Sequence, residues 1–231
     1  MQSILVRSVA ALAVAGSLAG AAQAASVPVT FERLSGLSGF SGTSVFRADL
    51  SGLGLTDIAS ITLFDSNSKQ GGSPGAFSGF DLDAIMLSTT RATAASQMSG
   101  LVTLPAFDFT TAGTAFTAGT QRAPVAPKLS GTDATGLNVD PAAATLGQFD
   151  AVSFTSGSVS LGDGGSITFH LNAPVSTAGL YLYVGEVGNT PGENLGGVFV
   201  ASAPVPEPST WALTLAGLGL CSVFLRRRRQ A

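Results

Sequence analysis

Short segments in which apolar and polar residues alternate recur through the middle of the chain, and they predict β-strands. Between residues 44 and 50, Phe46, Ala48 and Leu50 would share one strand face, while Arg47 and Asp49 would occupy the other. We expect further strands at residues 27–31, 59–64, 80–88, 149–155, 158–161, 166–171, 180–184 and 198–202. Turns rich in Gly, Asn and Pro separate them. Many short strands at this spacing favour an all-β body, either a β-sandwich or a jelly roll.

The pattern is weaker between residues 89 and 144. A short helix is expected at 90–97, and strands at 101–104 and 106–109 would be interrupted by Pro105. Residues 110–144 are rich in Ala, Thr, Gly and Pro and are expected to be mainly loop, although a structureless segment of this length is uncommon in a compact domain. Pro28 lies in the first strand, which we therefore place at a sheet edge, because proline cannot donate to a ladder.

The N-terminus has the pattern of a secretory signal peptide, which we expect to form a helix. A short segment with one positive charge, Arg7, precedes an apolar run at residues 8–19. Ala22 and Ala24 then form a small-x-small site, so that cleavage is expected after Ala24, with Ala25 as the alternative. The chain is therefore expected to be exported.

The C-terminus combines an extended segment, an apolar helix and a cluster of positive charge. Pro206 and Pro208 each remove a backbone donor and exclude a helix around Glu207. Residues 211–225 carry no charge and would form a single transmembrane helix of roughly 22 Å. Four arginines, Arg226, Arg227, Arg228 and Arg229, follow as a stop-transfer signal that holds the C-terminus in the cytoplasm.

This tail resembles the PEP-CTERM sorting signal. The resemblance rests on the helix, the arginines and a seven-residue motif: Val205, Pro206, Glu207, Pro208, Ser209, Thr210 and Trp211. It is also similar to the C-terminal motif of ice-binding-type proteins. The resemblance implies a Gram-negative, exopolysaccharide-producing bacterium, in which an exosortase recognises Pro-Glu-Pro and removes the helix after the body has crossed the inner membrane. A plain tail anchor with a proline-rich stalk is the alternative.

Three regions follow: a signal peptide at 1–24, an extracellular all-β domain at 25–204 and the sorting signal at 205–231. Between residues 25 and 205 there are six basic and thirteen acidic residues, so that the body carries a charge near −7. An acidic body argues against nucleic-acid binding, which requires a basic face. The single cysteine, Cys221, lies in the apolar tail, so the body has no disulfide. Cys221 is expected to be a small apolar helix residue, with lipidation as the alternative.

Asp81 and Asp83 are the leading candidates for a binding site. Residues two apart on a strand share a face, and Ile85 and Leu87 are expected to continue that face. Asp65 lies at the other end of the intervening Gly-rich loop, and hard oxygen ligands of this kind suit Ca²⁺. The spacing does not fit an EF-hand. The alternative is that these acids are solvated or accept hydrogen bonds from the amides of turns.

Other chemistry is less well supported by the sequence. His170 is the only histidine and would need Asp163 or Asp150 to form a triad, but the chain lacks a G-x-S-x-G motif. Tyr181 and Tyr183 share a strand face and would stack on sugars if exposed. Glu186 and Glu193 would have to flank a cleft to act as a glycosidase pair. We therefore expect a non-enzymatic protein of the cell surface or exopolysaccharide matrix, with no catalytic residues. A Ca²⁺-dependent or carbohydrate-binding adhesion module is the first alternative and a secreted hydrolase the second.

Overall fold

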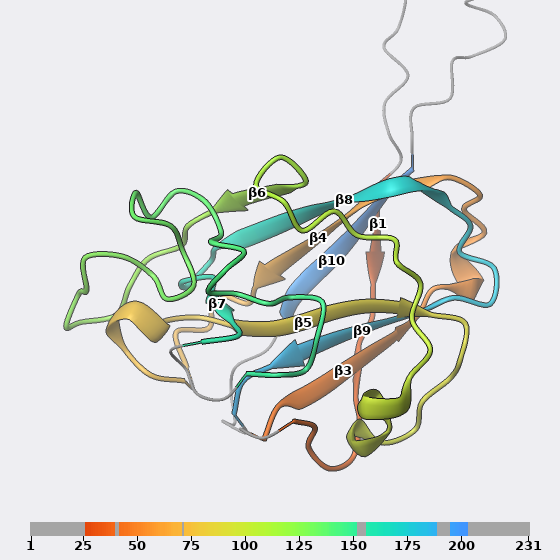
Figure 1. Cartoon of the computed structure of the whole chain (residues 1–231), viewed down its shortest axis with the longest axis horizontal. Coiled ribbons are helices and arrows are strands. Elements are labelled where there is room, and N and C mark those ends of the chain that lie inside the picture. Colours follow the sequence, from red (N-terminus) through yellow and green to blue (C-terminus); the bar gives the residue numbers. More distant parts are fainter. Residues whose placement is uncertain (1–25, 40–41, 71, 152–155, 189–194, 203–231) are drawn as a thin grey trace, which may run out of the picture. The chain divides into compact units, whose positions relative to one another are not determined.

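The body of the chain is built from two antiparallel sheets of five strands each. The computed structural model describes residues 26–39, 42–70, 72–151, 156–188 and 195–202, all within one compact unit at residues 24–203. Figure 1 shows the two sheets as two layers of this unit. The predicted signal peptide, sorting motif, transmembrane helix and arginine cluster lie outside the described residues. Among the described residues, no helix has the length and apolar character needed to cross a membrane.

The first sheet has the order β1-β10-β4-β8-β6 and the second the order β2-β3-β9-β5-β7. The strands of the first sheet are β1 (Ser26–Val29), β10 (Leu195–Ser202), β4 (Ile58–Asp65), β8 (Ser166–Val175) and β6 (Thr114–Thr117). Those of the second are β2 (Glu32–Arg33), β3 (Ser44–Asp49), β9 (Tyr181–Glu186), β5 (Asp81–Ser88) and β7 (Val159–Ser160). The helices described are short 3₁₀ turns: η1 (Ser51–Leu53), η2 (Gly75–Phe77) and η3 (Ala95–Gly100).

The strand pairs are nested along the chain. β1 pairs with β10, β3 with β9, β4 with β8 and β5 with β7, all antiparallel. The outermost pair therefore brings together the two ends of the body, and each following pair lies further inside the sequence. Within this nested set, β3, β4 and β5 alternate between the two sheets, and so do β7, β8, β9 and β10. Each connection within these two runs therefore crosses from one layer to the other.

The core lies between the sheets and is formed by the alternating apolar residues of both. Ile61 and Leu63 of β4 and Phe169 of β8 contribute from the first sheet, and Leu82 and Leu182 from the second; all are fully buried in one cluster. A residue on the inner face of either sheet thus loses its contact with water, which is the main stabilising contribution of a two-layer β fold. The all-β prediction is confirmed at this level.

The outer face of the second sheet is also covered. A second apolar cluster joins Val45 of β3 and Tyr183 of β9 to Ala95 and Met98 of η3. Arg47 therefore lies under this layer with only 4% of its surface exposed, where it donates to Glu32 Oε2 at 2.5 Å and to the carbonyl of Ala92. The alternation in residues 44–50 predicted the strand, but on its polar face Arg47 is covered and only Asp49 is exposed.

Predicted and observed strands agree closely outside the central segment. Pro28 lies on β1, which forms an edge of the first sheet as expected. In the segment 101–109, single bridges at Leu104 and Phe107 replace the two predicted strands. The expected helix at 90–97 is the 3₁₀ turn η3, shifted toward the C-terminus. Of the strand expected at 149–155, residues 149–151 are not in a strand, and residues 152–155 lie outside the described part.

The long segment from residue 118 to residue 151 is irregular but well packed. Its buried apolar residues Val139, Ala144 and Leu146 join the main core cluster, so the segment acts as a cover for it. At Gly131 the backbone is left-handed (φ +72°), and a Cβ atom there would lie 2.1 Å from the carbonyl oxygen of Ser158. Close backbone contact of this kind fixes the segment without regular secondary structure. β6 lies just before it and was not expected from the sequence.

Candidate functional site

Asp65 holds three separate chain segments together at the end of β4. Its Oδ1 atom accepts hydrogen bonds from the backbone amides of Asn67 and Gly164, each at 2.7 Å. Its Oδ2 atom accepts from the amide of Phe80 at 3.0 Å. Only 8% of the residue is exposed. The predicted alternative, in which an acid accepts from the amides of turns, is confirmed for Asp65, and we call this arrangement the Asp65 clasp.

Asp81 and Asp83 are buried and form hydrogen bonds within the protein. Asp81 accepts a hydrogen bond from the hydroxyl of Ser160 on β7. Asp83 accepts from the hydroxyl of Thr43 at 2.5 Å and from the amide of Ala151 at 3.1 Å. Asp83 therefore connects the start of β3 to the end of the long irregular segment. Neither acid is solvated, with 1% and 0% of their surfaces exposed respectively.

The two acids do not share a face with Ile85 and Leu87, so that part of the prediction is wrong. The register between β5 and β9 shifts between Leu82 and Ile85, which marks a β-bulge. Leu82, Ile85 and Leu87 all enter the core cluster. The bulge changes the alternation along β5, and so the residues after it turn toward the core while the acids form their contacts outside it.

Burial raises the pKa of Asp83 to about 6 from its ordinary value of 3.8. The largest cause is loss of solvation, which disfavours the carboxylate. The hydrogen bonds from Thr43 and Ala151 act in the opposite direction, and the nearby charge of Asp150 raises the pKa further. The protonation of the Asp83 carboxyl group therefore changes at mildly acidic pH.

The structure does not assemble the expected calcium ligands into a cluster. Within the described ranges, no three His, Cys, Asp or Glu residues gather closely enough to hold a metal ion. Both carboxylate oxygens of Asp65 and of Asp83 already accept hydrogen bonds from the protein, and so does one oxygen of Asp81. The calcium hypothesis for Asp65, Asp81 and Asp83 stays a prediction without a cluster to support it.

The other candidate residues form contacts that do not fit the catalytic roles considered for them. His170 is exposed on β8, and its charge acts on Asp108, whose pKa is lowered mainly by hydrogen bonds from Thr110. Asp163 instead pairs with Arg122, at 3.4 Å between Oδ1 and Nε. Asp150 accepts a hydrogen bond from the hydroxyl of Thr145 at 2.6 Å. These contacts engage both predicted triad partners elsewhere.

Two further predicted pairs can be placed only in part. Tyr183 is fully buried, and its hydroxyl accepts from the amide of Ala92 at 2.7 Å and donates to the carbonyl of Thr90 at 2.8 Å. It is therefore not available to stack on a sugar, whereas Tyr181 is half-buried. Glu186 is buried at the end of β9, and Glu193 lies outside the described residues.

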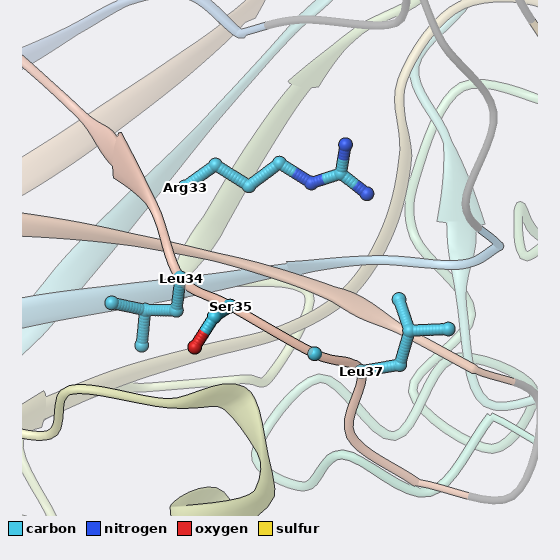
Figure 2. Close-up of a pocket in the computed structure, with 5 residues that line it drawn as sticks. Arg33, Leu34, Ser35 and Leu37 are labelled. Carbon is cyan, nitrogen blue, oxygen red and sulfur yellow. The ribbon is translucent and has the colours of Figure 1, made fainter.

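Two hollows are present on the surface of the described body. One, of about 560 Å³, lies along the segment after β2, where Arg33 and Leu37 project to one side while Leu34 and Ser35 project to the other (Figure 2). The Arg33 guanidinium group donates to the Ser44 hydroxyl at 2.8 Å. The second, of about 540 Å³, has a mixed lining on the outer side of the second sheet: Ser38, Gly39, Met86, Met98, Ser99, Gln148, Phe149 and Asp150. The described lining of neither hollow includes a predicted metal ligand.

The Asp65 clasp was only partly visible in the sequence. Asp65 and Asn67 lie at the start of a Gly-rich loop, a pattern that indicates a turn in which an acid accepts from nearby amides. Gly164, however, is 99 residues away from Asp65 in the chain. Ser160 and Thr43, which donate to Asp81 and Asp83, have no distinguishing pattern at all, because a single hydroxyl partner is set by the fold.

The body and the tail together define the class of protein. An all-β domain precedes a C-terminal segment with the sequence features of a membrane sorting signal. Comparison with known families identifies that segment: residues 204–229 match the PEP-CTERM protein-sorting motif. No curated protein and no solved structure matches the chain. The chain therefore carries a PEP-CTERM sorting signal, and this signal implies an exported protein that is transiently anchored in the membrane before exosortase processing.

Proposed function

We propose that this protein is a non-enzymatic structural or interaction protein of the cell surface or exopolysaccharide matrix. The observation that carries the proposal is the match of residues 204–229 to the PEP-CTERM motif. The signal peptide takes the chain across the inner membrane, and the apolar helix at 211–225 holds it there with Arg226–Arg229 in the cytoplasm. Pro206, Glu207 and Pro208 then present an extended backbone to the exosortase, because the prolines exclude a helix.

The body delivered in this way is a jelly-roll β-sandwich. The nested strand pairs support this, since a jelly roll is a long antiparallel hairpin that is rolled up so that its outer and inner pairs fall into two sheets. β2 and β6 are additional edge strands in this description. Jelly rolls occur in lectin and capsid domains, which bind through surface loops or assemble with copies of themselves. A matrix or surface role suits such a scaffold.

The use of the acidic residues supports a role without catalysis. Asp65 and Asp83 accept hydrogen bonds from backbone amides, and Asp81 accepts from a serine hydroxyl. In these positions the acids fix loops and strand ends, which makes them part of the scaffold. An acid that acts in catalysis must instead lie within reach of a bound substrate.

The proposal is tested by following the protein in its host with and without the exosortase. In the parent strain we expect the body in the surface or released fraction, and in an exosortase deletion strain we expect it in the inner-membrane fraction. A matched control replaces Pro206 and Pro208 by alanine in the parent strain and should reproduce the membrane retention. Equal surface delivery in all three strains would contradict the proposal.

A further inference from the structure

The start of the first strand of the body and the end of its last strand lie close together. Ser26, where β1 begins, pairs with Ala201, and Ser202, where β10 ends, pairs with Ile58. Ile58 begins β4 and pairs in turn with Val175 at the end of β8. Four strand termini therefore meet at one end of the first sheet, which we call the terminal end.

Two loops complete the terminal end and are tied to each other. Residues 50–57 connect β3 to β4, and residues 176–180 connect β8 to β9. The buried Thr177 links them: its amide donates to the carbonyl of Leu55 at 2.9 Å, and its hydroxyl accepts from the amide of Leu55 at 3.1 Å. Asp57 is the only charged residue in the two loops. The two loops are held together by these hydrogen bonds and contain a single charge. Another protein can therefore contact this surface while removing little charge from water.

The length of chain beyond β10 places a limit on the exosortase. Pro206 lies four residues after Ser202, so these two positions are separated by at most about 14 Å even in a fully extended chain. The predicted signal-peptide cleavage site is closer still, since Ala24 lies two residues before Ser26, or about 7 Å at most. A protease that engages Pro206–Pro208 must therefore work within a short distance of the terminal end.

We propose that the terminal end is the surface of the folded body that faces the exosortase during cleavage. The short connection after Ser202 makes this surface part of the substrate, so the enzyme must accommodate it together with the Pro-Glu-Pro motif. The opposite end, which contains the Asp65 clasp at the close of β4, stays free for other partners at that stage. This inference rests on the proposed function, because it requires that an exosortase cleaves the tail.

The test places a bulky group at one end of the body or the other. All variants carry Cys221→Ala, which removes the only native thiol. Thr56→Cys introduces a thiol at an exposed position of the terminal end, two residues before Ile58, and Ser68→Cys introduces a matched one at an exposed position after β4. Precursor accumulates in spheroplasts depleted of exosortase and is labelled with polyethylene glycol maleimide. The exosortase is then induced, and the conversion of precursor to cleaved product is followed.

Labelling at Thr56→Cys should slow cleavage several-fold, whereas labelling at Ser68→Cys should leave the rate unchanged, because simultaneous engagement is blocked only at the terminal end. Both unlabelled variants should be cleaved at the parent rate, which controls for folding. A Gly-Ser insertion of about eight residues between Ala203 and Pro204 adds a reach of roughly 16 Å and should restore cleavage of the labelled Thr56→Cys protein. Equal rates for the two labelled proteins would overturn the inference. Failure of the parent chain to be cleaved at all would instead refute the proposed function.

Discussion

The buried carboxyl group of Asp83 should make the body more stable at pH 5 than at pH 7. Its pKa is raised to about 6 in the folded protein, against an ordinary value of 3.8. The folded state therefore binds the proton more tightly than the unfolded state. The resulting stabilisation is fully present below the unfolded pKa and is lost as the pH rises through the folded one. Between pH 7 and pH 5 this linkage increases the free energy of unfolding by about 1.3 kcal/mol.

Three acids with lowered pKa values titrate outside this pH window. The pKa values of Asp49, Asp108 and Asp133 are lowered, chiefly by hydrogen bonds from Ser51, Thr110 and Thr135 respectively, so these acids titrate below the window. Urea unfolding of the purified protein at the two pH values measures the difference directly. Asp83→Asn removes the titrating group, so its own difference should fall close to zero whatever its absolute stability. Asp57→Asn, at an exposed site, should keep the increase. A raised pKa for Asp83 would be refuted if the free energy of unfolding of the parent protein did not increase at pH 5, or if that of Asp83→Asn increased as much as that of the parent.

Three further outcomes follow from the fold. Asp65→Ala should lower the free energy of unfolding by about 3 kcal/mol, because three backbone amides lose their acceptor, whereas Asp57→Ala should change it by less than about 0.5 kcal/mol; urea unfolding compares the two. Millimolar Ca²⁺ should leave the thermal midpoint unchanged, since the described acids form no metal cluster, and a clear rise in the midpoint would restore the calcium hypothesis. Gly131→Ala should destabilise by several kcal/mol, because the added Cβ meets the Ser158 carbonyl, whereas Gly52→Ala, with open space around it, should be nearly neutral in the same assay.

The sequence predicts the strands well because their apolar residues alternate and their turns contain Gly, Asn and Pro. β4 and β8 illustrate this: Ile61, Leu63, Ile167 and Phe169 all fall on the inner face where the alternation places them. Alternation of this kind involves only residues that are close together in the chain, so it can be read directly from the sequence. The pairing of the strands depends on contacts between distant residues, and it could not be predicted from the same patterns.

The central segment was hard to predict for a physical reason. Its apolar residues Leu129, Val139 and Leu146 are buried, but their spacing follows neither a strand nor a helix. Side-chain hydrogen bonds fix the backbone there instead, as in the acceptance by Asp133 of the amide and hydroxyl of Thr135. Such segments carry the composition of a loop even when they form part of the core cover.

The candidate site was predicted in composition and missed in geometry. Asp65, Asp81 and Asp83 lie near glycine-rich turns, as the sequence suggested, but they are buried, and their partners Gly164, Ser160 and Thr43 come from distant parts of the chain. The β-bulge in β5 further changes which face each acid occupies. Neither feature has a local signal. By contrast, the sorting tail could be identified from sequence alone, because its recognition depends on a contiguous motif rather than on a fold.

The central claim is that an exosortase removes the C-terminal tail, and the intact mass of the protein released by its host tests this most directly. The account predicts a mass that lacks the signal peptide and the entire stretch from Trp211 to Ala231, and a precursor that keeps this stretch when the exosortase gene is deleted. A released protein whose mass still includes Trp211 to Ala231 would contradict it.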